Sequence, residues 1–135
     1  MSLIHRRSFL VFVFALSLLL PGLARAQDDP TPKKRLRSPA TVRGFIGGES
    51  HDSYVIRARS GRTMTVRISW RREGDNSAGF SISKSANFFS AEPVGFGKES
   101  ADGKRWTGRI PATGNYYIYV TAHPTAHYTL RVTVK

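Results

Sequence analysis

The chain has 135 residues, no cysteine, and 21 lysine and arginine residues against 9 aspartate and glutamate residues, which gives a formal net charge of +12 at pH 7. This length suits one small domain behind a leader segment and excludes two domains. The absence of cysteine excludes a disulfide framework and a lipid-anchored lipoprotein, so apolar strand faces must supply the stability.

The first 26 residues have the features of a secretory signal peptide. Arg6 and Arg7 form a positive n-region, residues 8–20 are almost wholly apolar, and residues 24–26 (Ala-Arg-Ala) suit a signal peptidase. The apolar run is shorter than the ~20 residues that a membrane-spanning helix needs. We therefore predict cleavage after residue 26 and export to the periplasm or the medium. Export excludes a nucleic-acid partner, and cleavage leaves no stable membrane span.

Cleavage would leave residues 27–135 with 18 basic and 9 acidic residues, a net charge of +9. Residues 27–39 contain three prolines and the basic run Lys-Lys-Arg-Leu-Arg at 33–37. This composition predicts an extended, solvated linker before a folded domain over residues 40–135. The basic run is either a charged tether or a contact for anionic envelope polymers and lipid headgroups.

Residues 40–135 contain short runs in which apolar and polar residues alternate, as expected for half-buried strands. The clearest run is 63–70, and no window has the 3.6-residue period of a helix. The predicted strands are 41–46, 52–59, 63–70, 78–83, 94–96, 106–110, 116–121 and 128–134. Short strands separated by turn residues predict an all-β fold, a single small antiparallel β-sandwich of about seven or eight strands. We expect the last two strands to form a closing hairpin.

The histidines and carboxylates of the predicted mature chain do not form a recognisable catalytic or metal-binding set. In the sequence His51-Asp52-Ser53, neighbouring side chains of a strand point to opposite faces, so they cannot converge as a triad. His123 and His127 flank a short loop and could share a metal, but no third ligand is evident nearby. We predict no catalytic residue, no metal and no cofactor.

Four arginines occupy outward positions of predicted strands: Arg57, Arg59, Arg67 and Arg131. If they share one exposed face, they would attract an anionic polysaccharide of the envelope, with an affinity that falls as salt rises. The alternative is a cationic surface that keeps the protein soluble and has no dedicated partner.

Several short segments occur in a familiar order: Asp52-Ser53-Tyr54, Gly61, residues 110–116 (Ile-Pro-Ala-Thr-Gly-Asn-Tyr) and residues 128–132 (Tyr-Thr-Leu-Arg-Val). This order resembles the bacterial pre-peptidase C-terminal-like (PPC-like) β-sandwich. Within that group it is most similar to the periplasmic inhibitors of g-type lysozyme. The resemblance extends over nearly the whole predicted mature chain.

The resemblance implies a protein partner, a g-type lysozyme, whose cleft the inhibitor blocks with a loop. The Ser-Gly-x-Tyr-type motif of such inhibitors would be Thr113, Gly114, Asn115 and Tyr116 here, assisted by His123 and His127. This interpretation predicts that Thr113, Tyr116 and the loop 122–127 lie together at one exposed end, and a fully buried Tyr116 with no projecting loop would count against it. The alternative is that the motif is a turn whose Tyr116 is buried in the core.

Overall fold

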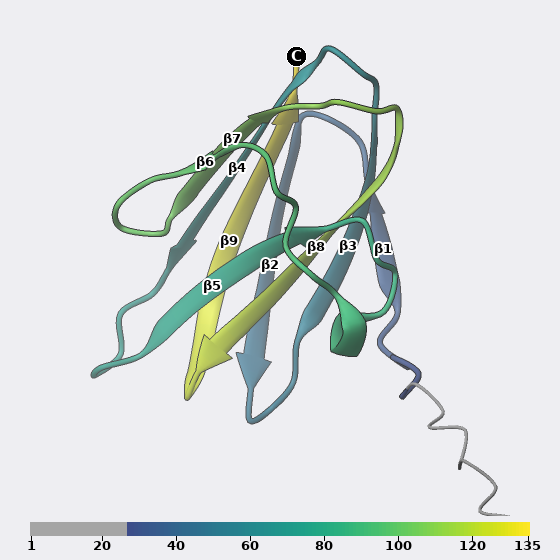
Figure 1. The fold of residues 1–135 in the computed structure, drawn as a ribbon. Helices are drawn as coiled ribbons and strands as arrows, with labels where there is room; N and C mark the ends of the chain where they lie inside the picture. The colour runs from purple at the N-terminus through teal and green to yellow at the C-terminus, as the bar shows by residue number, and fades with distance from the viewer. Residues whose placement is uncertain (1–26) are drawn as a thin grey trace, which may run out of the picture.

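The computed structural model describes residues 27–135, and the candidate signal peptide lies outside this range. Two sheets pack face to face (Figure 1). The first sheet has the strand order β1-β3-β8-β5, with β1 (Lys33–Leu36), β3 (Asp52–Ala58), β8 (Gly114–His123) and β5 (Ser77–Ser83). The second has the order β2-β9-β4-β7-β6, with β2 (Ala40–Gly47), β9 (Thr125–Val134), β4 (Thr63–Trp70), β7 (Arg105–Arg109) and β6 (Lys98–Glu99).

The predicted all-β sandwich is confirmed, with nine strands in the described part of the chain. Seven of the predicted strands correspond to observed ones. Residues 94–96 do not form a strand; beside them, Pro93 makes a single bridge to Ser83. A short 3-10 helix, Phe88–Ser90, lies in the connection between β5 and β6.

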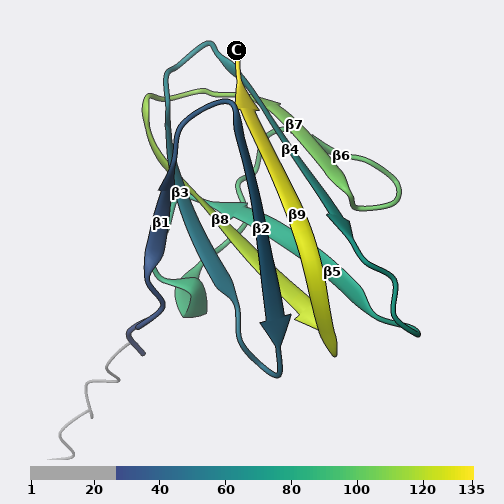
Figure 2. The same cartoon turned by 180° about the vertical axis from the view of Figure 1, so that it is seen from behind.

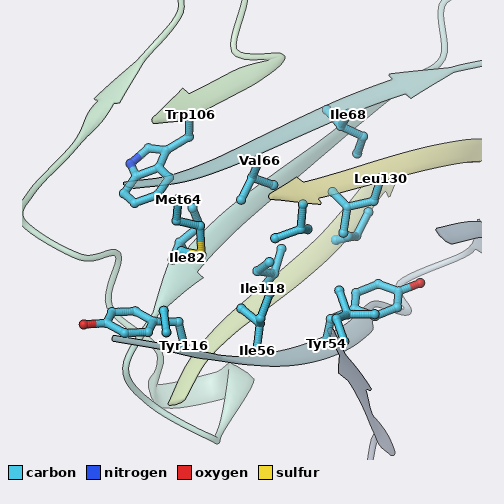
Figure 3. Packing of buried hydrophobic residues seen from close by; sticks show 14 of the residues in the cluster. Tyr54, Ile56, Met64, Val66, Ile68, Ile82, Trp106, Tyr116, Ile118 and Leu130 are labelled. Atoms are coloured by element: carbon cyan, nitrogen blue, oxygen red, sulfur yellow. The ribbon is translucent and has the colours of Figure 1, made fainter. Parts of the chain in front are cut away.

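Apolar and polar residues alternate along the strands, and the apolar side chains form the core. Ile118 of β8 and Leu130 of β9 are both fully buried, and so are Val66 of β4 and Ile56 of β3. Figure 3 shows these side chains meeting between the two sheets. Each large apolar side chain that is fully buried stabilises the fold by roughly 1.5–3 kcal/mol relative to exposure, and this core holds the sandwich together without disulfides.

The segment 27–39 is more ordered than the solvated linker that its composition predicts. β1 pairs in parallel with β3, and Leu36 enters the core with 8% of its surface exposed. The sandwich therefore begins before residue 40, and one of its strand pairs is parallel. Because β1 covers an edge of β3 that would otherwise present unpaired backbone groups, this segment has a role in the sheet that its composition does not reveal.

Asp29 fastens the start of this segment to the sandwich. Its carboxylate accepts hydrogen bonds from the backbone N–H groups of Thr31 (3.0 Å) and Phe88 (3.2 Å). The His51 ring nitrogen Nε2 lies 3.2 Å from the same carboxylate. Burial alone would raise the pKa of Asp29, but these hydrogen bonds outweigh it and lower the pKa from 3.8 to about 2.

Replacing Asp29 by asparagine is expected to lower the free energy of unfolding by about 1–2 kcal/mol at pH 7. A carboxyl group whose pKa is lower in the folded state stabilises the fold above its ordinary pKa. That contribution disappears as the pH falls from about 4 to about 2. Urea unfolding at pH 7 and near pH 2 measures it, with Asp28→Asn as the control because Asp28 is exposed. Equal losses at both pH values would contradict the assignment.

The predicted closing hairpin is wrong. β8 belongs to the first sheet and β9 to the second, and only Pro124 separates them. A two-residue hairpin needs residues such as Asn-Gly with positive φ, and proline has no N–H for a ladder. The chain therefore crosses between sheets at Pro124, and the apolar faces of the two strands meet across the core.

Candidate functional site

Two turns, exposed except for the buried Ile110, lie side by side at the end of the sandwich that holds the C-terminus (Figure 1). We call residues 59–62, between β3 and β4, and residues 110–113, before β8, the paired turns. The backbone joins them through Gly61 N–H to Ile110 O and Ile110 N–H to Arg62 O, each 2.8 Å. Gly61 has a φ of +85°, which a residue with a side chain rarely adopts.

Side chains reinforce the paired turns. The Ser60 N–H donates to Thr113 Oγ1 (2.9 Å), and Ser60 Oγ donates to the carbonyl of Pro111 (3.1 Å). These contacts fix the backbone of both turns, while Arg62 remains exposed between them and solvent. The end of the sandwich is therefore a rigid projection that carries two exposed arginines, Arg59 and Arg62.

The Thr113–Tyr116 motif supports the paired turns from the core side. Tyr116 is 1% exposed, and its hydroxyl donates to the carbonyl of Ala112 (2.7 Å), an arrangement like the tyrosine corner of other β-sandwiches. Lys84 covers the Tyr116 ring at 4.0 Å and donates to the carbonyl of Asn115 (3.0 Å). A Cβ atom on Gly114 would lie 2.9 Å from the Lys84 ammonium nitrogen, so this glycine makes room for the lysine. Tyr116 is therefore a core residue, and Thr113 acts through Ser60.

The expected grouping of Thr113 and Tyr116 with His123 and His127 is wrong. His123 ends β8 and lies about 30 Å along the strand from its first residue, Gly114. The projecting loop expected at 122–127 is absent from the described structure, because those residues, Pro124 apart, belong to β8 and β9. His127 is exposed on β9 and packs against Phe45, with ring centroids 4.6 Å apart.

His51 is buried against the N-terminal segment. Its ring stacks on Phe88 with a centroid distance of 3.8 Å, and its Nε2 faces Asp29. Among residues 27–135, no group of three or more histidine, aspartate or glutamate side chains could hold a metal ion. The His51–Asp29 pair therefore has a structural role, since it holds residues 27–32 against the sandwich.

The four arginines of the predicted cationic face do not share one face. Arg57 lies on β3 of the first sheet and Arg59 in the turn that follows it, whereas Arg67 and Arg131 belong to the second sheet. There, Arg67 of β4 lies directly opposite Arg131 of β9, and Arg105 of β7 lies opposite Arg67 on the other side. The alternation of β4 and β9 predicts the outward positions of Arg67 and Arg131. The place of Arg105 beside them follows only from the register of β7.

Known proteins resemble this chain in structure rather than in sequence. No protein-family model matches the chain, and no curated protein matches it in sequence. The structure is similar to that of Aeromonas hydrophila PliG, a periplasmic inhibitor of g-type lysozyme, with a TM-score of 0.61 and 25% identity over 76% of this chain and 96% of that one.

Two further solved structures share the fold. The pre-peptidase C-terminal domain of a Bacillus anthracis collagenase has a TM-score of 0.56 and 19% identity over 81% of this chain and all of that one. PliG of Salmonella Typhimurium has a TM-score of 0.51 and 19% identity over 76% of this chain and 98% of that one. The resemblance to the PPC-like sandwich is thus confirmed as one of structure. None of the helical segments described is long and apolar enough to cross a membrane.

Proposed function

We propose that this protein is an exported inhibitor of a g-type lysozyme and that it acts by blocking the enzyme cleft. The observation that carries the proposal is the likeness to Aeromonas hydrophila PliG, which covers 96% of that inhibitor. Such a function needs binding alone, with no catalytic residue and no cofactor. The signal-peptide features of residues 1–26 support export, to the periplasm or beyond, where such an enzyme would be met.

The paired turns are the contact surface that we propose. A rigid projection loses little conformational entropy when it enters a cleft, because its backbone is already held by hydrogen bonds between the two turns. Glycoside hydrolases carry carboxyl groups at the reacting centre. The exposed Arg62 can donate charge-assisted hydrogen bonds to such a group. Thr113 contributes by holding Ser60, and Tyr116 by supporting the turn from the core.

The test is inhibition of a purified g-type lysozyme by residues 27–135, which contain all nine strands of the two sheets. Clearing of peptidoglycan is followed at low and physiological salt, with a c-type lysozyme as the control enzyme. Selective inhibition at near-stoichiometric amounts is the expected result. The absence of inhibition at a large excess would overturn the proposed function and leave the fold unaffected.

Arg62→Ala is expected to weaken inhibition about tenfold, the equivalent of one lost charge-assisted hydrogen bond. Thr113→Ala should weaken it less, because the Ser60 N–H loses its acceptor while the backbone bonds between the turns remain. His123→Ala, at the far end of β8, is the matched control and should leave the inhibition constant unchanged. A loss with His123→Ala alone would move the contact to the opposite end of the sandwich.

A further inference from the structure

The outward side of the second sheet concentrates positive charge in one line. Arg105, Arg67 and Arg131 lie directly opposite one another on β7, β4 and β9, and we call them the arginine row. Neighbouring strands are about 4.8 Å apart, and like charges placed directly opposite destabilise a sheet. Within residues 27–135, none of the three forms an ion pair with a carboxylate. A bound anion would relieve this repulsion.

Hydroxyl groups surround the arginine row. The next outward residues along the same three strands are threonine or serine: Thr65, Ser69, Thr107, Thr129 and Thr133. The large hydrophobic residue exposed on this sheet is Phe45 of β2, which packs on His127. His127 lies two outward positions along β9 from Arg131. Protein partners usually need an aromatic or aliphatic anchor at the centre of the contact, which the arginine row does not offer.

Three shallow hollows follow one another along β4 and β9, the strands that run side by side in Figure 2. One of about 400 Å³ lies towards the C-terminus and a second of about 430 Å³ lies beside it, and the arginine row lines both. A third, of about 280 Å³, shares Ser69 and Thr129 with the second and adds Arg43. Because each hollow shares lining residues with the next, the three form a continuous track.

The track is cationic along its length. Lys135 lines the first hollow, Lys104 the second and Arg43 the third. Asp102 is the only acidic side chain among the described residues that line it. Its Oδ1 atom already accepts hydrogen bonds from Ser100 Oγ (2.6 Å) and the Lys104 N–H (3.0 Å). A linear anion could therefore meet positive charge at each hollow.

We propose that this face binds a linear, carboxylate-bearing polysaccharide that lies along β4 and β9. The planar guanidinium groups of the arginine row pair with sugar carboxylates, and the surrounding threonine and serine hydroxyls bond to sugar hydroxyls. The surface lies on a sheet face, whereas the paired turns lie at the end of the sandwich. Glycan binding is thus separate from the proposed inhibition, and one molecule can do both.

The test uses residues 27–135 and polygalacturonate as the probe, with calorimetry at 50 and 200 mM salt. The variant Arg67→Gln/Arg105→Gln/Arg131→Gln should bind at least about 30-fold more weakly, because it loses three charge-assisted contacts that solvent partly screens. The control Lys34→Gln/Arg35→Gln/Arg57→Gln removes the same charge from exposed residues of the first sheet and should bind within about threefold of the parent. Thermal unfolding checks that both variants are folded.

Each other outcome overturns the proposal. Equal losses in both triple variants would show attraction by net charge alone. Equal affinity for poly-L-glutamate, or tighter binding to vesicles of anionic lipid, would show that the partner is not a polysaccharide. Affinity that does not fall between the two salt concentrations would rule out pairing with the arginine row. The arginine-row variant should still inhibit lysozyme, because its paired turns are unchanged. Loss of inhibition would show that the two functions share this face.

Discussion

Replacing Trp106 by alanine is expected to lower the free energy of unfolding by about 3–5 kcal/mol, the usual cost of deleting a large buried aromatic side chain. Trp106 of β7 is 8% exposed and lies opposite Val66 of β4. Figure 3 shows its indole ring at the margin of the core near Met64. The ring also meets Phe96 edge-on, at a centroid distance of 5.7 Å. Alanine would leave a cavity between the sheet and the segment 93–97.

Two glycines shape the site of the Trp106 ring and offer a second way to disturb it. A Cβ atom at Gly97 would lie 2.4 Å from the indole, and one at Gly108 would lie 2.5 Å from it. Gly108→Ala should therefore displace the ring and reproduce part of the loss without deleting any atom of Trp106. Urea unfolding followed by circular dichroism measures both changes, and Trp106→Phe, which keeps an aromatic ring, should cost less. A loss below about 1 kcal/mol for Trp106→Ala would show that the ring is not part of the core.

The strands of the sandwich are predictable from the sequence because alternation is a local signal. In β4, Met64, Val66 and Ile68 recur at every second position, and all three are buried. The pattern identifies which side of a strand is buried, but it does not say which sheet the strand joins. β8 and β9 share the pattern and are consecutive, which suggests a hairpin, yet each pairs with other strands. Pro124 was the signal that could have prevented this error.

β1 cannot be predicted from the sequence, for a different reason. Its four residues contain one apolar side chain, Leu36, so neither alternation nor hydrophobicity marks it as a strand. It is held by backbone pairing with β3 and by the contacts that Asp29 makes with Phe88 and His51, residues distant in sequence. Contacts of this kind depend on the finished fold, and composition alone therefore indicates a linker.

The candidate sites were predictable only in part, because both depend on positions across strands. The Thr113–Tyr116 motif was identified as either an inhibitory loop or a turn around a buried tyrosine, and Tyr116 is buried. The arginine row needs the registers of β7, β4 and β9, which place Arg105 beside Arg67. An alternating pattern in one strand carries no information about its register with another strand. The prediction from the sequence therefore placed Arg57 and Arg59 on one face with Arg67 and Arg131, in place of Arg105.

Replacing Tyr128 by phenylalanine should lower the free energy of unfolding by about 2–3 kcal/mol, although it removes one oxygen atom. Tyr128 of β9 is 2% exposed, and its hydroxyl donates to the Asp52 carboxylate of β3 (2.5 Å) and contacts the Tyr54 hydroxyl. Burial, with the hydrogen bond to Asp52, raises the pKa of Tyr128, so the hydroxyl keeps its proton. The link joins the two sheets through the core. Phenylalanine would leave a carboxylate oxygen and a buried hydroxyl without this partner.

A double-mutant cycle separates this link from packing. Tyr128→Phe and Asp52→Asn should each destabilise the protein, and together they should cost less than the sum, because both remove the same hydrogen bond. Tyr117→Phe is the control, since the Tyr117 side chain is half-buried on the outward side of β8. Gly44→Ala should resemble Tyr128→Phe, because its Cβ would lie 2.6 Å from the Tyr128 hydroxyl oxygen. Strict additivity of Tyr128→Phe and Asp52→Asn would mean that the hydroxyl stabilises the sandwich without help from the carboxylate.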